Sequence, residues 1–210
     1  MFITFEGIDG SGKSTQVHRA AEWLRAAGHD VQVVRDPGST QVSERIRTLL
    51  LDADVQMCGR AELFLFAAAR AQLVEERIRP ALRSGAVVLS DRFYDSTTAY
   101  QHGARGVSTI EWMQDLHRES TNGLVPDRTY IIDVPVSVAD ARRYGSEEDR
   151  MEREATSFRE RVRSAYHTIA RQDPDRVRVV EGDQDEEQVH IQVREDLTKL
   201  LSSTNVGTPQ

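Results

Sequence analysis

The sequence predicts an α/β fold in which a parallel sheet of five strands is covered by helices on both faces. Short apolar segments alternate with longer stretches whose apolar residues recur at helical spacing, which is typical of βαβ units. A length of 210 residues suits one well-packed domain and is too short for two of comfortable size. We therefore expect a single domain over residues 1–201 and a flexible tail at 202–210, where the sequence is polar and contains glycine and proline.

The expected strands and helices follow one another along the chain. The candidate strands are the apolar segments at residues 2–5, 31–34, 87–89, 130–132 and 177–180. Helices are expected at residues 13–27, 60–84 and 152–170, with a last helix that ends near residue 201. Pro80 lies near the end of the second helix and predicts a kink or break there, because proline donates no backbone hydrogen bond. Residues 141–150 are charged, contain a glycine and show no apolar period, which predicts a mobile surface loop.

A glycine-rich segment directly follows the first predicted strand. It fits the pattern G-x-x-x-x-G-K-[ST] with the residues Gly7, Ile8, Asp9, Gly10, Ser11, Gly12, Lys13 and Ser14, and Thr15 comes next. In this motif backbone amides surround phosphates, the lysine reaches the β- and γ-phosphates, and the hydroxyl binds Mg²⁺. Because strand, motif and helix occur in the expected order, an ordinary β–α turn is the less favoured interpretation. We expect residues 7–15 to bind a nucleoside triphosphate, with Lys13 catalytic and Ser14 a metal ligand.

Composition argues against several classes of protein. The net charge is −7, which disfavours a protein that mainly binds nucleic acid, since such binding depends on neutralising phosphates. The one cysteine, Cys58, agrees with a reducing compartment, and we expect it to be a small, partly buried apolar residue. No apolar run approaches the ~20 residues of a membrane helix, and the first residues lack the basic segment of a signal peptide. We therefore expect a cytoplasmic protein that engages neither nucleic acid nor membrane.

Charged residues follow two further predicted strands. Arg35, Asp36 and Pro37 come after the second strand, and Asp91 and Arg92 come after the third. In an open parallel sheet ligands bind beyond the carboxyl ends of the strands, so these side chains should lie near the glycine-rich loop. Guanidinium groups fit phosphate oxygens bidentately, so two arginines there indicate a second phosphate-bearing substrate. The base-reading motif N-K-x-D of GTPases is absent from the sequence. Transfer of a phosphoryl group between two nucleotides is the reaction that this pattern favours.

The chain resembles the thymidylate kinase family over residues 1–201. The resemblance rests on the segments FEGIDGSGKSTQ, RDPGST, ELFLFAAARAQ, SDRFYDSTTAYQ and DRMERE. Two departures are visible: the family's common R-E-P-G-G-T is here R-D-P-G-S-T at residues 35–40, with Asp36 and Ser39 replacing glutamate and glycine, and Thr98 stands where many bacterial relatives have glutamine. The resemblance implies a three-layer P-loop kinase fold with a short lid at about 141–151. It also implies a homodimer that phosphorylates dTMP with ATP and Mg²⁺ in the synthesis of dTTP.

The resemblance further assigns roles to single residues. Asp9 is expected to accept a hydrogen bond from the 3′-hydroxyl of dTMP, and Phe66 to stack on thymine with Arg70 beside it. Ser96, Thr97 and Tyr100 are expected around the base and sugar, and Pro37 in the same pocket. Arg35 and Arg92 are expected to hold the acceptor phosphate, with Asp91 near Mg²⁺. No arginine lies among residues 9–11, so a lid arginine should supply positive charge, with Arg143 and Arg150 preferred over Arg142 and Arg153.

The residues alone leave alternatives open. Asp9 could bond its own turn, and Phe66 could be a core residue like Phe64. The charged side chains of residues 141–153 could form a solvated face. The whole protein could be another small P-loop kinase, with a different nucleotide or a nucleoside as acceptor. It could also be a nucleotide-binding regulatory or scaffold protein without catalysis.

Overall fold

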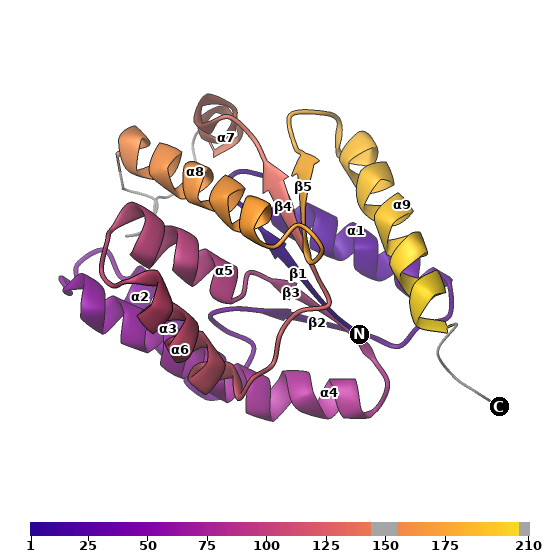
Figure 1. The fold of residues 1–210 in the computed structure, drawn as a ribbon, viewed down its shortest axis with the longest axis horizontal. Coiled ribbons are helices and arrows are strands. Elements are labelled where there is room, and N and C mark those ends of the chain that lie inside the picture. The colour runs from indigo at the N-terminus through magenta and orange to yellow at the C-terminus, as the bar shows by residue number, and fades with distance from the viewer. Residues whose placement is uncertain (144–154, 206–210) are drawn as a thin grey trace.

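The structure, a computed structural model, describes residues 1–143 and 155–205. Its centre is the predicted parallel sheet, formed by β1 (Phe2–Glu6), β2 (Val31–Arg35), β3 (Val87–Asp91), β4 (Arg128–Asp133) and β5 (Val177–Glu181). Their order across the sheet is β2-β3-β1-β4-β5 (Figure 1). Because β1 pairs with β3 on one side and with β4 on the other, the loop after β1 lies at the middle of the sheet.

Each of these strands extends past the predicted apolar segment to an ionisable residue. The five residues lie at the same edge of the sheet: Glu6, Arg35, Asp91, Asp133 and Glu181. The register confirms the common edge, since Phe5 and Arg35 both pair with Asp91. The strands were predicted from apolar residues alone, so each predicted strand ends before the charged residue that completes the real one. The sheet therefore carries its polar groups where ligands bind in open parallel sheets.

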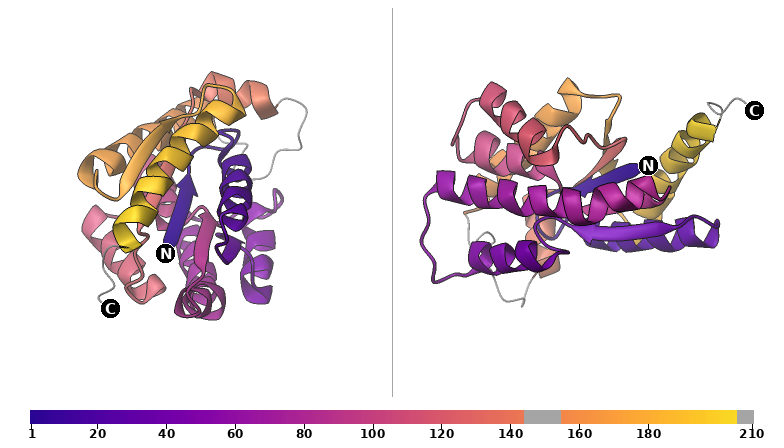
Figure 2. Two further views of the ribbon diagram at one scale, coloured as in Figure 1. Left: turned by 90° about the vertical axis from the view of Figure 1, so that its right-hand side faces the viewer. Right: turned by 90° about the horizontal axis from the view of Figure 1, so that it is seen from below.

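Helices cover both faces of the sheet, as the alternating sequence predicts (Figures 1 and 2). The helices α1 (Lys13–Ala26) and α9 (Glu186–Asn205) pack on one face against Ile3, Phe5 and Leu89. The opposite face, with Phe2 and Val88, is covered by α3 (Gly59–Leu73), α4 (Arg79–Arg83), α5 (Tyr94–Thr97) and α8 (Thr156–Gln172). Alternate strand residues thus enter separate cores, as they do in a three-layer fold.

The helices differ in detail from the prediction. Helical backbone continues from Gly59 to Arg83, as expected for residues 60–84, but its middle part η1 (Val74–Ile78) is π-helical and leads into α4, whose first turn contains Pro80. A second π-helical segment, η2 (Thr98–Ala104), continues α5. The pattern did not predict α2 (Gln41–Leu51), α6 (Ile110–Thr121) or α7 (Val136–Arg143). Within the described residues no helix has the length and apolar character needed to cross a membrane.

Four expectations about residues at the surface need correction. Residues 141–143 belong to α7 and not to a loop, because Val136 and Ala139 are buried one turn apart and anchor that helix. Residues 202–205 continue α9 and do not belong to the expected tail; residues 206–210 lie outside the described part. Cys58 is exposed, since it precedes α3 on the surface. Phe64 is also exposed, with 48% of its surface accessible, and is not a core residue.

Candidate active site

The glycine-rich loop packs closely against the rest of the fold. Gly7, Gly10 and Gly12 all have positive φ, which glycine adopts without strain. A Cβ on Gly7 would lie 2.6 Å from the carbonyl oxygen of Ile132, and one on Gly10 would lie 2.5 Å from that of Ala139. Side chains are therefore excluded at both positions. The loop leads into α1, which begins at Lys13, so the positive end of a helix dipole adds to an anion site here.

A cleft of about 510 Å³ opens on one side of this loop. Six of the expected ATP-binding residues line it, namely Gly10, Ser11, Gly12, Lys13, Ser14 and Thr15. Across the cleft lie Gly182 and Gln184, which precede α9, and Val189 of α9 itself. Arg142 of α7 spans the gap, because its guanidinium donates to the carbonyl oxygens of Ser11 at 3.2 Å and Gly182 at 2.9 Å. The volume and the loop amides suit a nucleoside triphosphate.

The first three residues of the motif lie elsewhere. Ile8 is 3% exposed and belongs to the core beneath α8, and Gly7 is buried. Asp9 lines a second cavity on the other side of the loop. The loop therefore lies between the two cavities and contributes residues to both.

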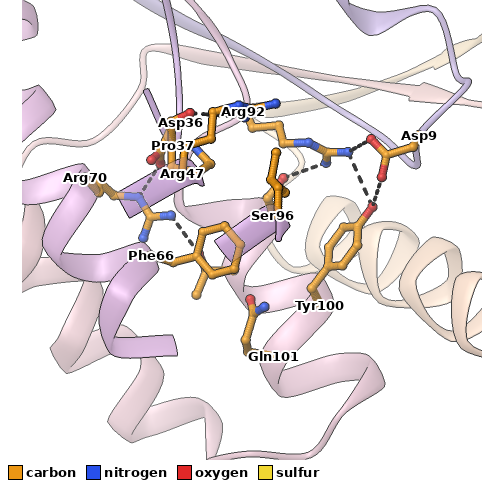
Figure 3. Close-up of a pocket in the computed structure, with 12 residues that line it drawn as sticks. Asp9, Asp36, Pro37, Arg47, Phe66, Arg70, Arg92, Ser96, Tyr100 and Gln101 are labelled. Carbon is orange, nitrogen blue, oxygen red and sulfur yellow. Dashed lines mark hydrogen bonds and ion pairs between the residues drawn. The ribbon is translucent and has the colours of Figure 1, made fainter. Parts of the chain in front are cut away.

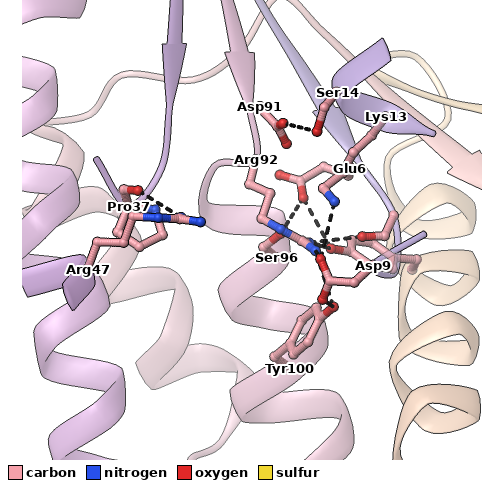
Figure 4. A network of polar contacts seen from close by, with 12 residues as sticks. Glu6, Asp9, Lys13, Ser14, Pro37, Arg47, Asp91, Arg92, Ser96 and Tyr100 are labelled. Carbon is pink, nitrogen blue, oxygen red and sulfur yellow. Dashed lines mark hydrogen bonds and ion pairs between the residues drawn. The ribbon is translucent and has the colours of Figure 1, made fainter. Parts of the chain in front are cut away.

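Ser14 and Asp91 meet at the base of the loop. The Ser14 hydroxyl donates a hydrogen bond to a carboxylate oxygen of Asp91, the last residue of β3 (Figure 4). Oxygen ligands of this kind are those that Mg²⁺ prefers, and Mg²⁺ commonly takes only one or two protein oxygens plus phosphates and water. The described residues contain no group of three histidine, cysteine or carboxylate side chains placed to hold a metal. This pair therefore fits a magnesium ion that is held jointly with the phosphates of a nucleotide.

The second cavity collects almost all of the expected acceptor-site residues (Figure 3). Its lining includes Asp9, Pro37, Phe66, Arg70, Arg92, Ser96, Thr97 and Tyr100. Asp36, which follows the second predicted strand, also lines it, as do three residues that the sequence did not single out: Arg47, Leu51 and Gln101. Arg35 is the exception, because its side chain is 51% exposed and pairs with Glu44 at 2.9 Å outside the cavity.

Arg92 is the centre of the polar network between the two cavities (Figure 4). Its guanidinium donates to Asp9 at 2.5 Å, to the carbonyl oxygen of Gly7 at 2.9 Å and to Ser96 at 2.9 Å. It also lies 5.3 Å from the ring centre of Tyr100, a cation–π contact. Arg92 has a positive φ of 69°, a backbone conformation that costs a non-glycine residue on the order of 1–3 kcal/mol. The fold thus holds the Arg92 side chain in place at the cost of local backbone strain.

Asp9 is ionised by its surroundings. Burial opposes its charge, but Arg92 and Lys13, whose ammonium lies 3.3 Å away, outweigh burial and hold the pKa of Asp9 well below its usual range. The Tyr100 hydroxyl donates to the other carboxylate oxygen at 3.3 Å. Asp9 therefore presents a fixed negative charge and hydrogen-bond acceptor to the acceptor cavity.

Glu6 is a functional candidate that the sequence reasoning missed. It is buried at the end of β1 and accepts hydrogen bonds from the Phe93 amide at 2.7 Å, the Tyr166 hydroxyl at 3.1 Å and the Ser96 hydroxyl. Burial and the nearby Asp95 raise its pKa to about 8, although Arg92 acts in the opposite direction. A charged residue that ends an apolar strand just before the glycine-rich loop was the available signal.

Arg70 forms a buried ion pair with Asp36. The guanidinium Nε lies 2.6 Å from Asp36, Nη2 donates to the Thr97 hydroxyl at 2.6 Å, and Arg70 is only 1% exposed. Burial raises the pKa of Asp36, and Arg70 opposes that shift. Within the described residues, Nη1 of Arg70 is buried without a hydrogen-bond partner. Such an orphan donor in the wall of a cavity favours a ligand with an acceptor oxygen there.

Arginines from two helices complete the surroundings. Arg47 of α2 lines the acceptor cavity and donates to the carbonyl oxygen of Pro37 at 3.2 Å. It was missed because the pattern did not predict α2. Arg143, at the end of α7, packs against the loop, with its Cδ 3.0 Å from the position that a Cβ on Gly10 would occupy. Arg150 and Arg153 lie outside the described residues.

Comparisons with known proteins agree with this geometry. The family model "Thymidylate kinase" matches residues 5–193. A thymidylate kinase of Desulfovibrio desulfuricans is 43% identical over 99% of both chains, and one of Kosmotoga olearia is 44% identical over 99% of this chain and all of its own. The crystal structure of thymidylate kinase from Ehrlichia chaffeensis superposes with a TM-score of 0.76 at 34% identity, covering 94% of this chain and 98% of its own. The sheet, the two cavities on one loop and these matches together show that the chain belongs to the thymidylate kinase family and is a nucleoside monophosphate kinase.

Proposed function

We propose that the two cavities hold ATP and dTMP, and that the residues between them direct transfer of the γ-phosphoryl group to the 5′-phosphate of dTMP. The observation that carries the proposal is the position of Asp9, which contacts Lys13 on the ATP side and Arg92 on the acceptor side. The phosphates of the two substrates would meet at these two cations. The product of the transfer is dTDP.

The lining of the acceptor cavity supports one orientation of dTMP. Phe66 and Arg70 lie together at one end, where an aromatic ring and an orphan donor suit a base with carbonyl oxygens (Figure 3). Tyr100 and Asp9 lie at the other end, where Asp9 would accept a hydrogen bond from the 3′-hydroxyl. Tyr100 is buried beside that position and would leave no room or partner for a 2′-hydroxyl. Arg92 and Arg47 supply the positive charge for the phosphate.

The proposed mechanism needs positioning and charge neutralisation rather than a protein nucleophile. An oxygen of the dTMP phosphate forms the new bond to the γ-phosphorus, and the bond from that phosphorus to the bridging oxygen of ADP breaks in line. Lys13, which is 7% exposed at the start of α1, stabilises the charge on the transferred group. Arg92 offsets the repulsion between the two anions and holds the acceptor oxygen in place.

Ser14 and Asp91 would hold the magnesium ion, together with phosphate oxygens. Bound Mg²⁺ neutralises charge on the β- and γ-phosphates. The hydroxyl and carboxylate of these two residues would supply the protein's oxygen ligands, and their mutual hydrogen bond keeps the two groups next to each other. We also assign an additional cationic role to Arg143, at the end of α7, and to Arg150, which lies outside the described residues.

We further propose that the protein acts as a homodimer in the cytoplasm. Large apolar side chains are exposed on three neighbouring helices: Val42 and Leu49 on α2, Phe64 on α3 and Trp112 on α6. The rings of Phe64 and Trp112 lie 6.0 Å apart, and Figure 1 shows these helices side by side. Sedimentation of the Phe64→Asp variant checks this, with Val125→Asp, an exposed apolar residue elsewhere, as control. A dimer that survives Phe64→Asp contradicts the assignment of the interface.

The test of the proposed reaction is a coupled assay of ADP release with ATP and Mg²⁺. The acceptors are dTMP, dUMP, dCMP, dGMP and AMP. We expect dTMP to give the highest kcat/KM. Preference for another acceptor would reassign the substrate within the kinase class. Tight ATP binding without ADP release for every acceptor would indicate a binding protein instead.

A further inference from the structure

Gln101 presents a carboxamide to the acceptor cavity. It belongs to η2, lines the cavity and is 1% exposed. Figure 3 shows its amide end directed toward the space between the rings of Phe66 and Tyr100. A carboxamide carries a donor on one side and an acceptor on the other. Which of them faces a ligand depends on what holds the amide from behind.

Glu62 holds that amide. Nε2 of Gln101 donates to Oε1 of Glu62 at 2.9 Å, and both side chains are buried. The same oxygen accepts a second hydrogen bond at 3.0 Å from Nε of Arg105. The guanidinium of Arg105 lies over the ring of Phe158, 4.8 Å from its centre. A carboxylate paired with a guanidinium accepts hydrogen bonds and donates none, so it can receive only the NH₂ side of Gln101.

The carbonyl oxygen of Gln101 is consequently turned away from Glu62. A base that offers an N–H at that point gains a hydrogen bond to the carbonyl. A base with a lone pair there meets another acceptor and leaves both groups unsatisfied, which is costly in a buried site. Thymine and uracil carry an N–H at ring position 3, whereas cytosine carries a lone pair there.

We propose that Glu62 is a specificity-determining positioning residue, which orients Gln101 so that its carbonyl selects a pyrimidine with an N3–H and rejects cytosine. The proposal rests on the proposed function, because it assumes that a pyrimidine monophosphate occupies the acceptor cavity. Glu62 acts through Gln101 and does not itself line the cavity. Arg105 keeps the Glu62 oxygen directed at Gln101.

The experiment compares direct binding of dTMP and dCMP to the full-length protein by calorimetry, together with kcat/KM for both. In Glu62→Met the acceptor for Nε2 is lost and Gln101 can turn to suit either base. The ratio of dTMP to dCMP affinity should then fall on the order of tenfold or more, with ATP binding unchanged. Glu62→Gln should restore most of the ratio, since its carbonyl, held by Arg105, still accepts from Gln101. Glu75→Met, on the surface segment η1, is the matched control and should keep the wild-type ratio.

Three results would overturn the proposal. One is an unchanged ratio in folded Glu62→Met. Another is a Glu62→Gln variant that loses as much discrimination as Glu62→Met, which would point to charge and not to the acceptor. The third is an unchanged ratio in Gln101→Met, which removes the carbonyl itself and decides the question even if Glu62→Met does not fold. Failure of the proposed function looks different, because the wild-type protein would then bind neither pyrimidine in preference to the other acceptors.

Discussion

Arg92 donates a 2.5 Å hydrogen bond to Asp9, a residue of the nucleotide-binding loop that faces the acceptor cavity. This pair joins the two halves of the site, because Asp9 also lies 3.3 Å from Lys13. The three charges fix each other's positions before either substrate binds. Preorganised charge of this kind is the main source of catalysis in phosphoryl transfer.

Replacement of Lys13 by alanine should remove most turnover and leave the fold intact. The lysine stabilises an anionic transition state and contributes little to the hydrophobic cores. Steady-state kinetics and circular dichroism of Lys13→Ala provide the measurement. Near-normal activity in the folded variant would contradict the assignment of the loop.

Replacement of Phe66 by alanine should weaken dTMP binding by about 1–3 kcal/mol, the range for stacking of a base on an aromatic ring. ATP binding should change little, because Phe66 does not line the ATP cleft. Isothermal titration with each nucleotide measures both. Val125→Ala, at an exposed apolar residue that lines neither cavity, is the control and should retain dTMP affinity. Normal dTMP binding by Phe66→Ala would place the base elsewhere.

The stability contributed by Glu6 should depend on pH. Its pKa is about 8 in the folded protein and near 4.5 when unfolded, so the folded state binds a proton more tightly. The contribution is complete below pH 4.5 and is lost as pH rises through about 8, by at most roughly 5 kcal/mol. Glu6→Gln cannot titrate. We therefore expect the unfolding free energy of the wild type, relative to that of Glu6→Gln, to be lower at pH 8.5 than at pH 5.5. Urea titrations of both proteins at the two pH values measure it.

The comparison with Glu6→Gln isolates this effect. Burial lowers the pKa of His117 and of His190, which makes the protein more stable as pH rises toward 6.5 and partly masks the loss from Glu6. Both histidines are present in both proteins, so their contribution cancels in the difference. A difference that stays constant from pH 5.5 to 8.5 would show that Glu6 keeps its charge throughout.

Removal of the lid arginines should affect the transition state more than the ground state. If Arg143 and Arg150 contact the phosphates only in the transition state, the double variant Arg143→Ala/Arg150→Ala should lose kcat and kcat/KM together. The loss should be on the order of 10²-fold or more. Direct binding of dTMP should be nearly unchanged. A double variant with wild-type kcat would contradict the assignment and make Arg142 the next candidate, since Arg142 contacts the carbonyl oxygen of Ser11 in the loop.

Much of the fold could be predicted because its signals are local. Apolar periodicity placed the five strands, and the glycine-rich motif placed the loop between β1 and α1. The ends of the strands were placed too early, because Glu6 and Asp91 are charged and interrupt the apolar pattern while continuing the ladder. Helix α2 was not predicted, because Val42 and Leu49 are apolar residues on its exposed face and obscure the helical spacing of the buried ones. Its N-cap was an available signal, since the Thr40 side chain accepts a hydrogen bond from the Ser43 amide.

The site could be predicted only where a motif fixed a residue's position. Asp9 belongs to the glycine-rich motif and Arg92 directly follows β3, whereas Tyr100 was expected only from the family resemblance; the structure gathers all three around one cavity. Arg35 shows the limit of that reasoning. Arg35 is the last residue of β2, but its guanidinium forms an ion pair with Glu44 of α2 outside the acceptor cavity. The two residues are nine positions apart, and no local sequence pattern predicts that they pair. Gln101 and Glu62 likewise depend on contact between two separate helices.

The nucleotide-binding loop separates the two cavities by the thickness of one stretch of backbone, since Asp9 lines one cavity and Gly10 the other. A single ligand could therefore reach both by passing Lys13 and Arg92. A thymidine and an adenosine joined through a polyphosphate would place its bridging anions between those two cations. Its affinity would rise steeply once the bridge is long enough to let both ends bind, and would fall again with longer bridges. The bridge length that gives the highest affinity would therefore measure the distance between the two sites, across which the phosphoryl group is transferred.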